Sequence, residues 1–152
     1  MKTIRKIASL RETLRAWRHA GQTVALVPTL GNLHQGHISL VEQARRQADR
    51  IVVSVFVNPT QFGPGEDYQA YPRKLDHDRR LTRAGAELLF APAVEEMYPR
   101  AEDAGTVVSV PGLSSILCGE FRPGHFDGVA SVVSRLFNIV QPDVAVFGQK
   151  DY

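Results

Sequence analysis

The sequence of 152 residues predicts an α/β fold, a doubly wound parallel sheet with helices on both faces. Two observations support this prediction. Short runs rich in Val, Ile and Leu alternate along the chain with longer segments whose apolar residues recur at helical spacing. The run at 51–57 is almost entirely β-branched or aromatic, which is typical of a strand buried on both faces of a parallel sheet. Strands that alternate with helices imply right-handed crossovers within one parallel sheet.

The first half of the chain is expected to contribute two helices and two strands. Ser9 and Glu12 have the spacing of a capping box, so the first helix begins at Ser9, and Gly21 ends it. A short apolar strand follows at 23–27, and a glycine-containing loop at 28–36 leads into the second helix. The apolar face of that helix comprises Leu40, Val41, Ala44 and Ala48. The buried run described above is the second strand.

The second half continues the alternation. Residues 58–67 contain two glycines and two prolines and are expected to form a loop. A third helix is predicted at 75–84, with Gly85 as its C-cap, and a strand at 88–91. A further strand is predicted at 106–110.

The clearest helical pattern lies near the end of the chain. Asp127 is expected to cap this helix, Pro142 ends it, and a last strand follows at 144–147. The apolar stripe of the helix comprises Val129, Val132, Val133, Leu136, Phe137 and Val140. The complete pattern describes a single Rossmann-like domain. Such a domain binds its ligand beyond the carboxyl ends of the strands, where the strand order reverses.

Composition argues against several classes of protein. Apolar residues make up 43% of the chain and charged residues 22%, as in an ordinary globular domain. The net charge of +2 is spread along the sequence and gives no reason to expect a nucleic-acid or membrane partner. The N-terminal residues lack the apolar core of a signal peptide, and Cys118, the only cysteine, allows no intrachain disulfide. We therefore expect a cytoplasmic protein.

Two histidines stand in the loop after the first predicted strand. His34 and His37 are three residues apart at the start of a helix, so both rings share one face. The helix end offers free N–H groups and a positive dipole, Gly36 leaves room for a ligand, and either imidazole could become cationic near neutral pH. We expect these groups to stabilise a phosphoryl transition state. The alternatives are plain surface or capping histidines, and a zinc site with further ligands elsewhere in the chain.

Uncharged amides, Asn58 and Gln61, follow the buried strand. Amides at this edge of a sheet can bind hydroxyl groups and a carboxylate, whereas the alternative for Asn58 and Pro59 is simple turn chemistry. Arg122 precedes the last helix, where it either pairs with an anionic substrate or phosphate or lies in a plain loop.

The last predicted strand is followed by Gly148, Gln149, Lys150 and Asp151. A lysine at this position can hold phosphate, and the alternative is a solvated turn. Asp76 and Asp78 either approach a magnesium ion or form a solvated helix face, and the solvated face is favoured.

With these loops in view, the chain resembles the pantothenate synthetases, a family of the nucleotidyltransferase superfamily that carries a His-x-Gly-His loop. That loop, at 34–37, indicates only the superfamily. Two longer strings, Asn-Pro-Thr-Gln-Phe at 58–62 and Arg-Pro-Gly-His-Phe-Asp-Gly at 122–128, indicate the family. The matching segments lie in order along the whole chain, at 27–37, 55–62, 71–73, 90–92, 95–99, 122–128, 136–143 and 148–151.

The resemblance implies an ATP- and magnesium-dependent ligase that joins pantoate to β-alanine through a pantoyl adenylate. It implies that His34 and His37 contact the phosphates, with His37 the donor in the transition state. It also implies that Gln61 binds pantoate near β-alanine, with Asn58 close by, and we place Arg122 in the same substrate site. The remaining ATP contacts are expected to be Leu30, Gly31, Asn32, Leu33, Gln35, Gly36, Gly148, Gln149, Lys150 and Asp151. The family is dimeric through this domain, so a homodimer is expected.

The sequence departs from the family pattern in two ways. Leu30 stands where methionine is usual, Asn32 where alanine is usual, and Gln149 where glutamate is usual, so one charge near the nucleotide is lost. The family also continues into a second domain that supplies a lid and part of the phosphate site. We therefore expect 1–152 to be the N-terminal ATP- and pantoate-binding domain, with the C-terminal lid domain absent from this chain. Such a domain alone is expected to turn over weakly or not at all.

Two other functions fit the same fold. One is nucleotidyl transfer to a second nucleotide, against which the loop at 58–62 argues because it matches a pantoate pocket. The other is a non-catalytic nucleotide-binding module.

Overall fold

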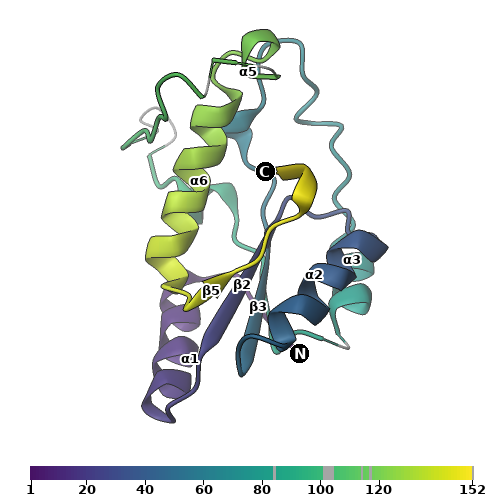
Figure 1. Ribbon diagram of the computed structural model, residues 1–152, viewed down its shortest axis with the longest axis vertical. Coiled ribbons are helices and arrows are strands. Elements are labelled where there is room, and N and C mark those ends of the chain that lie inside the picture. Colours follow the sequence, from purple (N-terminus) through teal and green to yellow (C-terminus); the bar gives the residue numbers. More distant parts are fainter. Residues whose placement is uncertain (84, 101–104, 114, 117, 152) are drawn as a thin grey trace.

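The described part of the chain folds around a parallel sheet of five strands in the order β1-β4-β3-β2-β5 (Figure 1). The computed structural model describes residues 1–83, 85–100, 105–113, 115–116 and 118–151. The strands are β1 Lys2–Ile4, β2 Val24–Thr29, β3 Arg50–Val55, β4 Leu88–Phe90 and β5 Val144–Ala145. The chain runs from β2 through β3 to β4 and then returns to place β5 on the other side of β2. The strand order therefore reverses at β2 and β5.

Helices cover both faces of this sheet, which confirms the predicted doubly wound architecture. The helices are α1 Ile7–His19, α2 Gln35–Arg45, α3 Leu75–Thr82, α4 Val94–Met97, α5 Cys118–Phe121 and α6 His125–Val140, with 3-10 turns η1 Pro59–Gln61 and η2 Gln149–Asp151. In Figure 1, α1 and α6 lie on one side of the strands, and α2 and α3 lie on the other. No helix within the described ranges is long and apolar enough to cross a bilayer.

The two faces of the sheet form two apolar clusters because successive strand residues point to opposite sides. Val24, Leu26 and Val52 pack with residues of α1 and α6, whereas Val27 and Val53 pack with residues of α2. The buried run at β3 is therefore covered on both faces, as its composition predicts. The stripe of α6 is confirmed as well, since its residues Val132, Leu136 and Val140 are buried, and only its outermost member, Phe137, is exposed.

Helix α1 begins two residues earlier than predicted, at Ile7, and the capping box at Ser9 is wrong. The N-cap residue, Lys6, makes no side-chain capping bond. Instead, the carboxylate of Glu96 accepts a hydrogen bond of 2.8 Å from the backbone N–H of Ile7 and a second of 3.1 Å from Lys6 Nζ. A side chain from α4 thus satisfies the helix end that a local serine was expected to cap.

Two further local predictions are wrong. Helix α6 begins at His125 after Gly124, whose φ of +77° favours glycine, so Asp127 lies in the first turn and makes no capping bond. Residues 106–110 form no strand, because this segment bonds to a helix: the N–H of Val108 donates to Ser131 Oγ of α6 at 2.8 Å.

The other differences concern short elements and element bounds. The edge strand β1 and the helix α4 were not predicted, and β5 ends two residues before the predicted end at 147. The predicted third helix matches α3 up to Thr82, while residue 84 lies outside the described residues.

Candidate functional site

The loop between β2 and α2 holds the two histidines at the point where the strand order reverses. Its turn requires left-handed backbone at Gly31, with φ +89°, and at Asn32, with φ +53°. A Cβ at Gly31 would lie 2.9 Å from Val55 Cγ1, so only glycine fits there. Thr29 Oγ1 accepts from the Gly31 N–H at 3.1 Å and donates to the carbonyl of Ser54 at 2.7 Å, which ties the loop to β3.

A buried carboxylate from α3 fixes the middle of this loop. Asp78 is 1% exposed and accepts hydrogen bonds from the N–H groups of Leu33 at 2.7 Å and Asn32 at 3.1 Å. The neighbouring His77 Nε2 lies 3.2 Å from the Leu33 carbonyl. The interpretation of a solvated helix face is therefore wrong for Asp78, although it holds for Asp76, whose side chain is exposed beside Arg79. Asp78 is a positioning residue that the sequence analysis missed.

The two imidazoles form a reciprocal capping box at the start of α2. His34 Nδ1 accepts from the N–H of Gly36 at 3.1 Å, and His37 Nδ1 accepts from the N–H of His34 at 3.3 Å. Backbone N–H groups can only donate, so both Nδ1 atoms are unprotonated and each neutral ring carries its proton on Nε2. The ring centroids are 4.2 Å apart. Two Nε2–H donors therefore lie side by side at a helix N-terminus.

Electrostatics favours the neutral form of His37. Burial lowers the pKa of His37 below its usual value of 6.5, and the neighbouring His34 and Lys150 lower the pKa further. Asp151 and Asp78 have smaller, opposite effects on the pKa. The lowered pKa of His37 therefore disfavours the expectation that this ring becomes cationic near neutral pH.

The segment after β5 lies close enough to His37 to shift the pKa of its ring. Strand β5 pairs with β2, so η2 emerges beside the loop of His37. Its turn is closed by Asp151, whose carboxylate accepts from the Gly148 N–H at 3.2 Å. Lys150 and Gln149 are exposed. The structure thus brings together the two segments for which the sequence predicts phosphate contacts.

Beyond β3, the 3-10 turn η1 presents Gln61. The side chain of Gln61 is 7% exposed, and its Oε1 accepts from Asn58 Nδ2 at 3.2 Å. No described residue accepts a hydrogen bond from Gln61 Nε2. The Nε2 atom therefore reaches solvent, and its two donor protons are suited to an acceptor on a ligand, such as a carboxylate or a hydroxyl oxygen.

Asn58 lies behind Gln61 and is completely buried. Its Oδ1 accepts from Thr60 Oγ1 at 3.0 Å and from Tyr98 Oη at 2.9 Å. Its Nδ2 donates to Gln61 Oε1 and, at 3.1 Å, to the carbonyl of Gly128. These bonds use both donor protons of the amide. The contacts therefore favour an indirect role for Asn58, and a direct contact with substrate stays a prediction.

Arg122 is engaged within the protein. Its Nε donates to Glu66 Oε1 at 2.8 Å, its Nη2 forms an ion pair with Glu66 Oε2, and its Nη1 lies 3.2 Å from His125 Nε2. The predicted contact of Arg122 with an anionic substrate stays a prediction.

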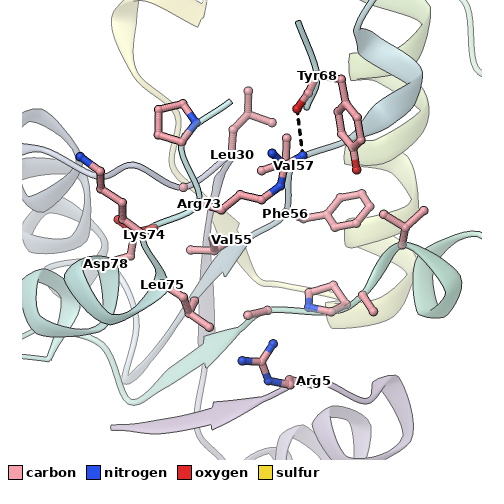
Figure 2. A pocket seen from close by; sticks show the side chains of 16 residues that line it. Arg5, Leu30, Val55, Phe56, Val57, Tyr68, Arg73, Lys74, Leu75 and Asp78 are labelled. Atoms are coloured by element: carbon pink, nitrogen blue, oxygen red, sulfur yellow. Dashed lines mark hydrogen bonds between the residues drawn. The ribbon is translucent and has the colours of Figure 1, made fainter. Parts of the chain in front are cut away.

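A cavity of about 310 Å³ opens beside the loop between β2 and α2, at the carboxyl ends of β3 and β4 (Figure 2). Leu30, Val57 and Asp78 line it together with Arg73. The guanidinium of Arg73 donates to the backbone carbonyls of Tyr68, Gln69 and Tyr71 and stacks on the Tyr68 ring, so it holds the wall of the cavity in place. Across the described residues, no group of three His, Cys, Asp or Glu side chains is placed to hold a metal ion.

Residues 2–152 match the family model described as pantoate-beta-alanine ligase. The chain belongs to the pantoate–β-alanine ligase family. The pantothenate synthetase of Shewanella halifaxensis (strain HAW-EB4) is 60% identical over 153 residues, covering 100% of this chain and 54% of that protein. The pantothenate synthetase of Shewanella loihica has the same identity and coverage.

Solved structures of the ligase family share the fold. The crystal structure of pantothenate synthetase from Thermus thermophilus has a TM-score of 0.87 at 54% identity, covering 95% of this chain and 51% of that chain. Pantoate-beta-alanine ligase from Francisella tularensis, complexed with beta-gamma ATP and beta-alanine, has a TM-score of 0.87 at 35% identity, covering 95% and 55%. The chain spans about half the length of the relatives it matches.

Proposed function

We propose that this chain is the nucleotide- and pantoate-binding part of an enzyme that condenses pantoate with β-alanine in an ATP-dependent reaction. A pantoate carboxylate oxygen attacks the α-phosphorus of ATP, so that pyrophosphate leaves and pantoyl adenylate forms. The β-alanine amine then attacks the acyl carbon, loses a proton and displaces AMP. The observation that carries the proposal is the pair of Nε2–H donors of His34 and His37 at the reversal point of the sheet.

In this proposal the nucleotide lies along 30–37 and 148–151. The charge that develops on the phosphate oxygens in the transition state is stabilised by the His37 Nε2–H, with His34 beside it. A neutral donor needs no proton transfer at this step, which agrees with the lowered pKa of His37. Lys150 adds a positive charge within electrostatic range of the same ring.

The substrate acid binds through Gln61. Its Nε2 protons face no described acceptor, and a pantoate carboxylate or hydroxyl oxygen supplies one. Asn58 and Arg122, which the family resemblance assigns to the same pocket, contact Gln61 and His125 respectively. In this proposal these contacts hold the substrate pocket, and direct contacts of Asn58 and Arg122 with substrate stay predictions.

Magnesium is proposed to arrive with the nucleotide. A magnesium ion is commonly held by phosphate oxygens and water, with few protein ligands.

We also propose that the chain forms a homodimer through its N-terminal domain. Large apolar side chains are exposed along one stretch of chain at 107–121, including Leu113 at 65% and Phe121 at 82%. Exposed apolar side chains that lie together on a surface mark interaction sites. In this proposal a second copy of the chain covers these side chains, since the same patch on both partners forms a self-complementary interface. We place the protein in the cytoplasm.

Calorimetric titration with Mg-ATP and then with pantoate tests the proposal. The chain is expected to bind ATP saturably, and His34→Ala/His37→Ala is expected to abolish binding while the control His19→Ala, exposed at the end of α1, preserves it. Equal ATP binding by the double variant would contradict the placement of the nucleotide. Turnover by a version extended past residue 152 separates the ligase from a non-catalytic nucleotide-binding module.

A further inference from the structure

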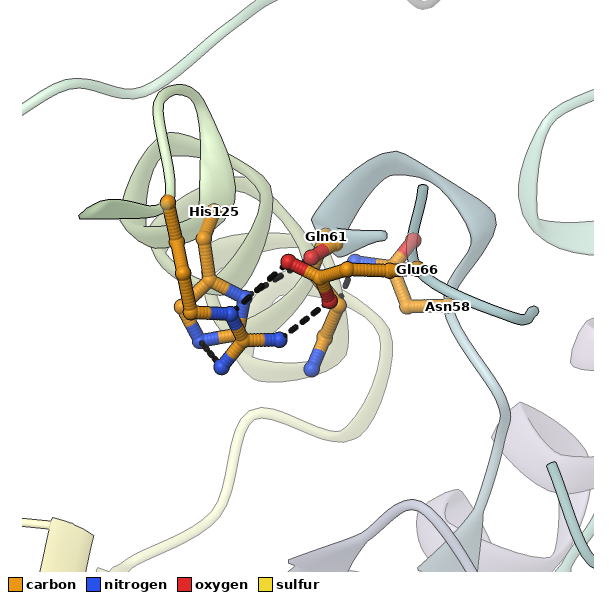
Figure 3. Close-up of polar contacts among 5 residues, drawn as sticks. Asn58, Gln61, Glu66 and His125 are labelled. Atoms are coloured by element: carbon orange, nitrogen blue, oxygen red, sulfur yellow. Dashed lines mark hydrogen bonds and ion pairs between the residues drawn. The ribbon is translucent and has the colours of Figure 1, made fainter. Parts of the chain in front are cut away.

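Three polar side chains, those of Glu66, Arg122 and His125, link the loop after η1 to the start of α6 and end at the backbone of Gln61 (Figure 3). Glu66 pairs with Arg122 through two hydrogen bonds. Arg122 Nη1 lies 3.2 Å from His125 Nε2, and His125 Nδ1 lies 2.7 Å from the backbone carbonyl of Gln61. Each contact joins residues that belong to different structural elements or to the loops between them.

The direction of each hydrogen bond between Arg122, His125 and Gln61 follows from which group can donate. A guanidinium can only donate, so His125 Nε2 is the acceptor and is unprotonated. The neutral ring then carries its proton on Nδ1 and donates it to the carbonyl of Gln61. The paired guanidinium of Arg122 holds the pKa of Glu66 below its usual range, so the carboxylate that orients the arginine stays charged.

Gln61 is therefore held at two separate points. His125 binds its backbone carbonyl, and Asn58 binds its side-chain oxygen. The close approach of α6 supports both contacts, because a Cβ at Gly128 would lie 2.7 Å from Gln61 Cα. The two constraints leave Nε2 as the free end of a buried side chain that is 7% exposed.

We propose that His125 is a positioning residue, which holds Gln61 through its backbone carbonyl so that the Gln61 amide presents both Nε2 protons to the substrate acid. The proposal deepens the proposed function and rests on it for the identity of Gln61 as the substrate contact. It assigns the string at 122–128 to the support of the substrate glutamine rather than to contact with substrate. Arg122 acts one step further back, through its contact with His125, and Glu66 acts two steps back, through Arg122.

The arrangement strengthens substrate binding because Gln61 is already ordered and loses little conformational entropy when substrate binds. Ordering one flexible side chain at a binding site lowers affinity by a factor of about two to ten. Removing the contact from His125 is therefore expected to weaken pantoate binding by about that factor. The affinity for ATP is expected to change by less than twofold.

Nuclear magnetic resonance tests the positioning role directly in the folded chain. The ¹⁵N shifts of the His125 ring are expected to show a proton on Nδ1 and none on Nε2. The Gln61 side-chain amide is expected to be rigid in the wild type and in His125→Asn, whose amide nitrogen takes the place of Nδ1. In His125→Leu its order parameter is expected to fall below about 0.6, the range of flexible groups. His19→Leu, exposed at the end of α1, is the matched control and is expected to leave Gln61 rigid.

The outcomes separate this proposal from the proposed function. A proton on His125 Nε2, or a rigid Gln61 amide in His125→Leu, overturns the positioning role. If a rigid Gln61 amide in the wild type shows no shift on titration with pantoate, the proposed substrate contact fails while the positioning role stands. If His125→Leu does not fold, Glu66→Gln decides. Loss of the carboxylate charge is expected to loosen the Gln61 amide, and an unchanged amide overturns the proposal.

Discussion

Replacing Gly128 by alanine tests whether helix α6 sets the position of Gln61. The added Cβ would lie 2.6 Å from the Thr60 carbonyl oxygen and 2.7 Å from the backbone N and Cα of Gln61. Ordinary contact begins near 3.4 Å, so η1 must retreat from α6 by about 0.8 Å. These contacts are all backbone atoms, which cannot rotate away as a side-chain tip can.

The expected effect on stability is small because two contributions oppose each other. Overpacking costs about 1–3 kcal/mol, and alanine favours a helix over glycine by about 1 kcal/mol. The free energy of unfolding should therefore fall by about 0–2 kcal/mol, measured by urea denaturation. The effect on ligand binding should be larger. A hydrogen bond to a charged ligand contributes about 1.5–3 kcal/mol, so loss of the Gln61 contact weakens pantoate binding by at least about tenfold.

The assay is calorimetric titration with pantoate and with Mg-ATP at matched folded fractions. Gly63→Ala is the control, since a Cβ there meets nothing closer than Glu66 Oε1 at 3.7 Å. The control should bind pantoate as the wild type does, and both variants should keep ATP affinity. Wild-type pantoate affinity in Gly128→Ala would refute the reasoning, because it would show that the place of η1 does not determine binding.

Three further predictions concern other parts of the chain. Asp78→Asn should lower the unfolding free energy by about 2–3 kcal/mol in urea titrations and weaken ATP binding, because a buried amide cannot accept from both loop N–H groups as the carboxylate does. Unchanged ATP affinity would show that the loop holds its shape without Asp78. The lowered pKa of His37 means that the folded chain binds fewer protons than the unfolded chain just below pH 6.5, so stability should fall as pH drops through 6.5 toward the lowered value. Urea unfolding across that range should show a smaller loss for His37→Asn than for the wild type, and equal losses would mean that other groups titrate there. Leu113→Asp/Phe121→Asp should yield a monomer in sedimentation experiments on a dimeric wild type, with the far-ultraviolet spectrum unchanged; a variant that stays dimeric would place the interface elsewhere.

The elements that depend on residues close together in the chain could be predicted from the sequence. The strand β3 was predictable because burial on both faces requires a continuous run of apolar residues. The helix α6 was predictable because burial of one face requires apolar residues at helical spacing. The place of His34 and His37 was predictable for the same reason, since a loop between a strand and a helix must end at the helix N-terminus.

The support of the site was not predictable, because it depends on partners far apart in the sequence. Asp78 bonds to Leu33 across 45 positions, and nothing in the pattern of α3 distinguishes it from the exposed Asp76. The cap of α1 failed for the same reason, since Glu96 reaches Ile7 across 89 positions. Residues that bind a ligand are recognisable by their type and place, whereas residues that hold them are recognisable only when the fold has brought them together.

Helices α3 and α6 lie on opposite faces of the sheet, so substitutions in them act on different parts of the proposed site. The loop that holds His34 and His37 is braced by Asp78 of α3 on one face of the sheet, and Gln61 is braced by His125 and Gly128 of α6 on the other. The two sets of braces therefore belong to helices on opposite faces of the sheet (Figure 1). A substitution in the packing beneath α6 is expected to change the position of Gln61 more than the shape of the loop that holds His34 and His37.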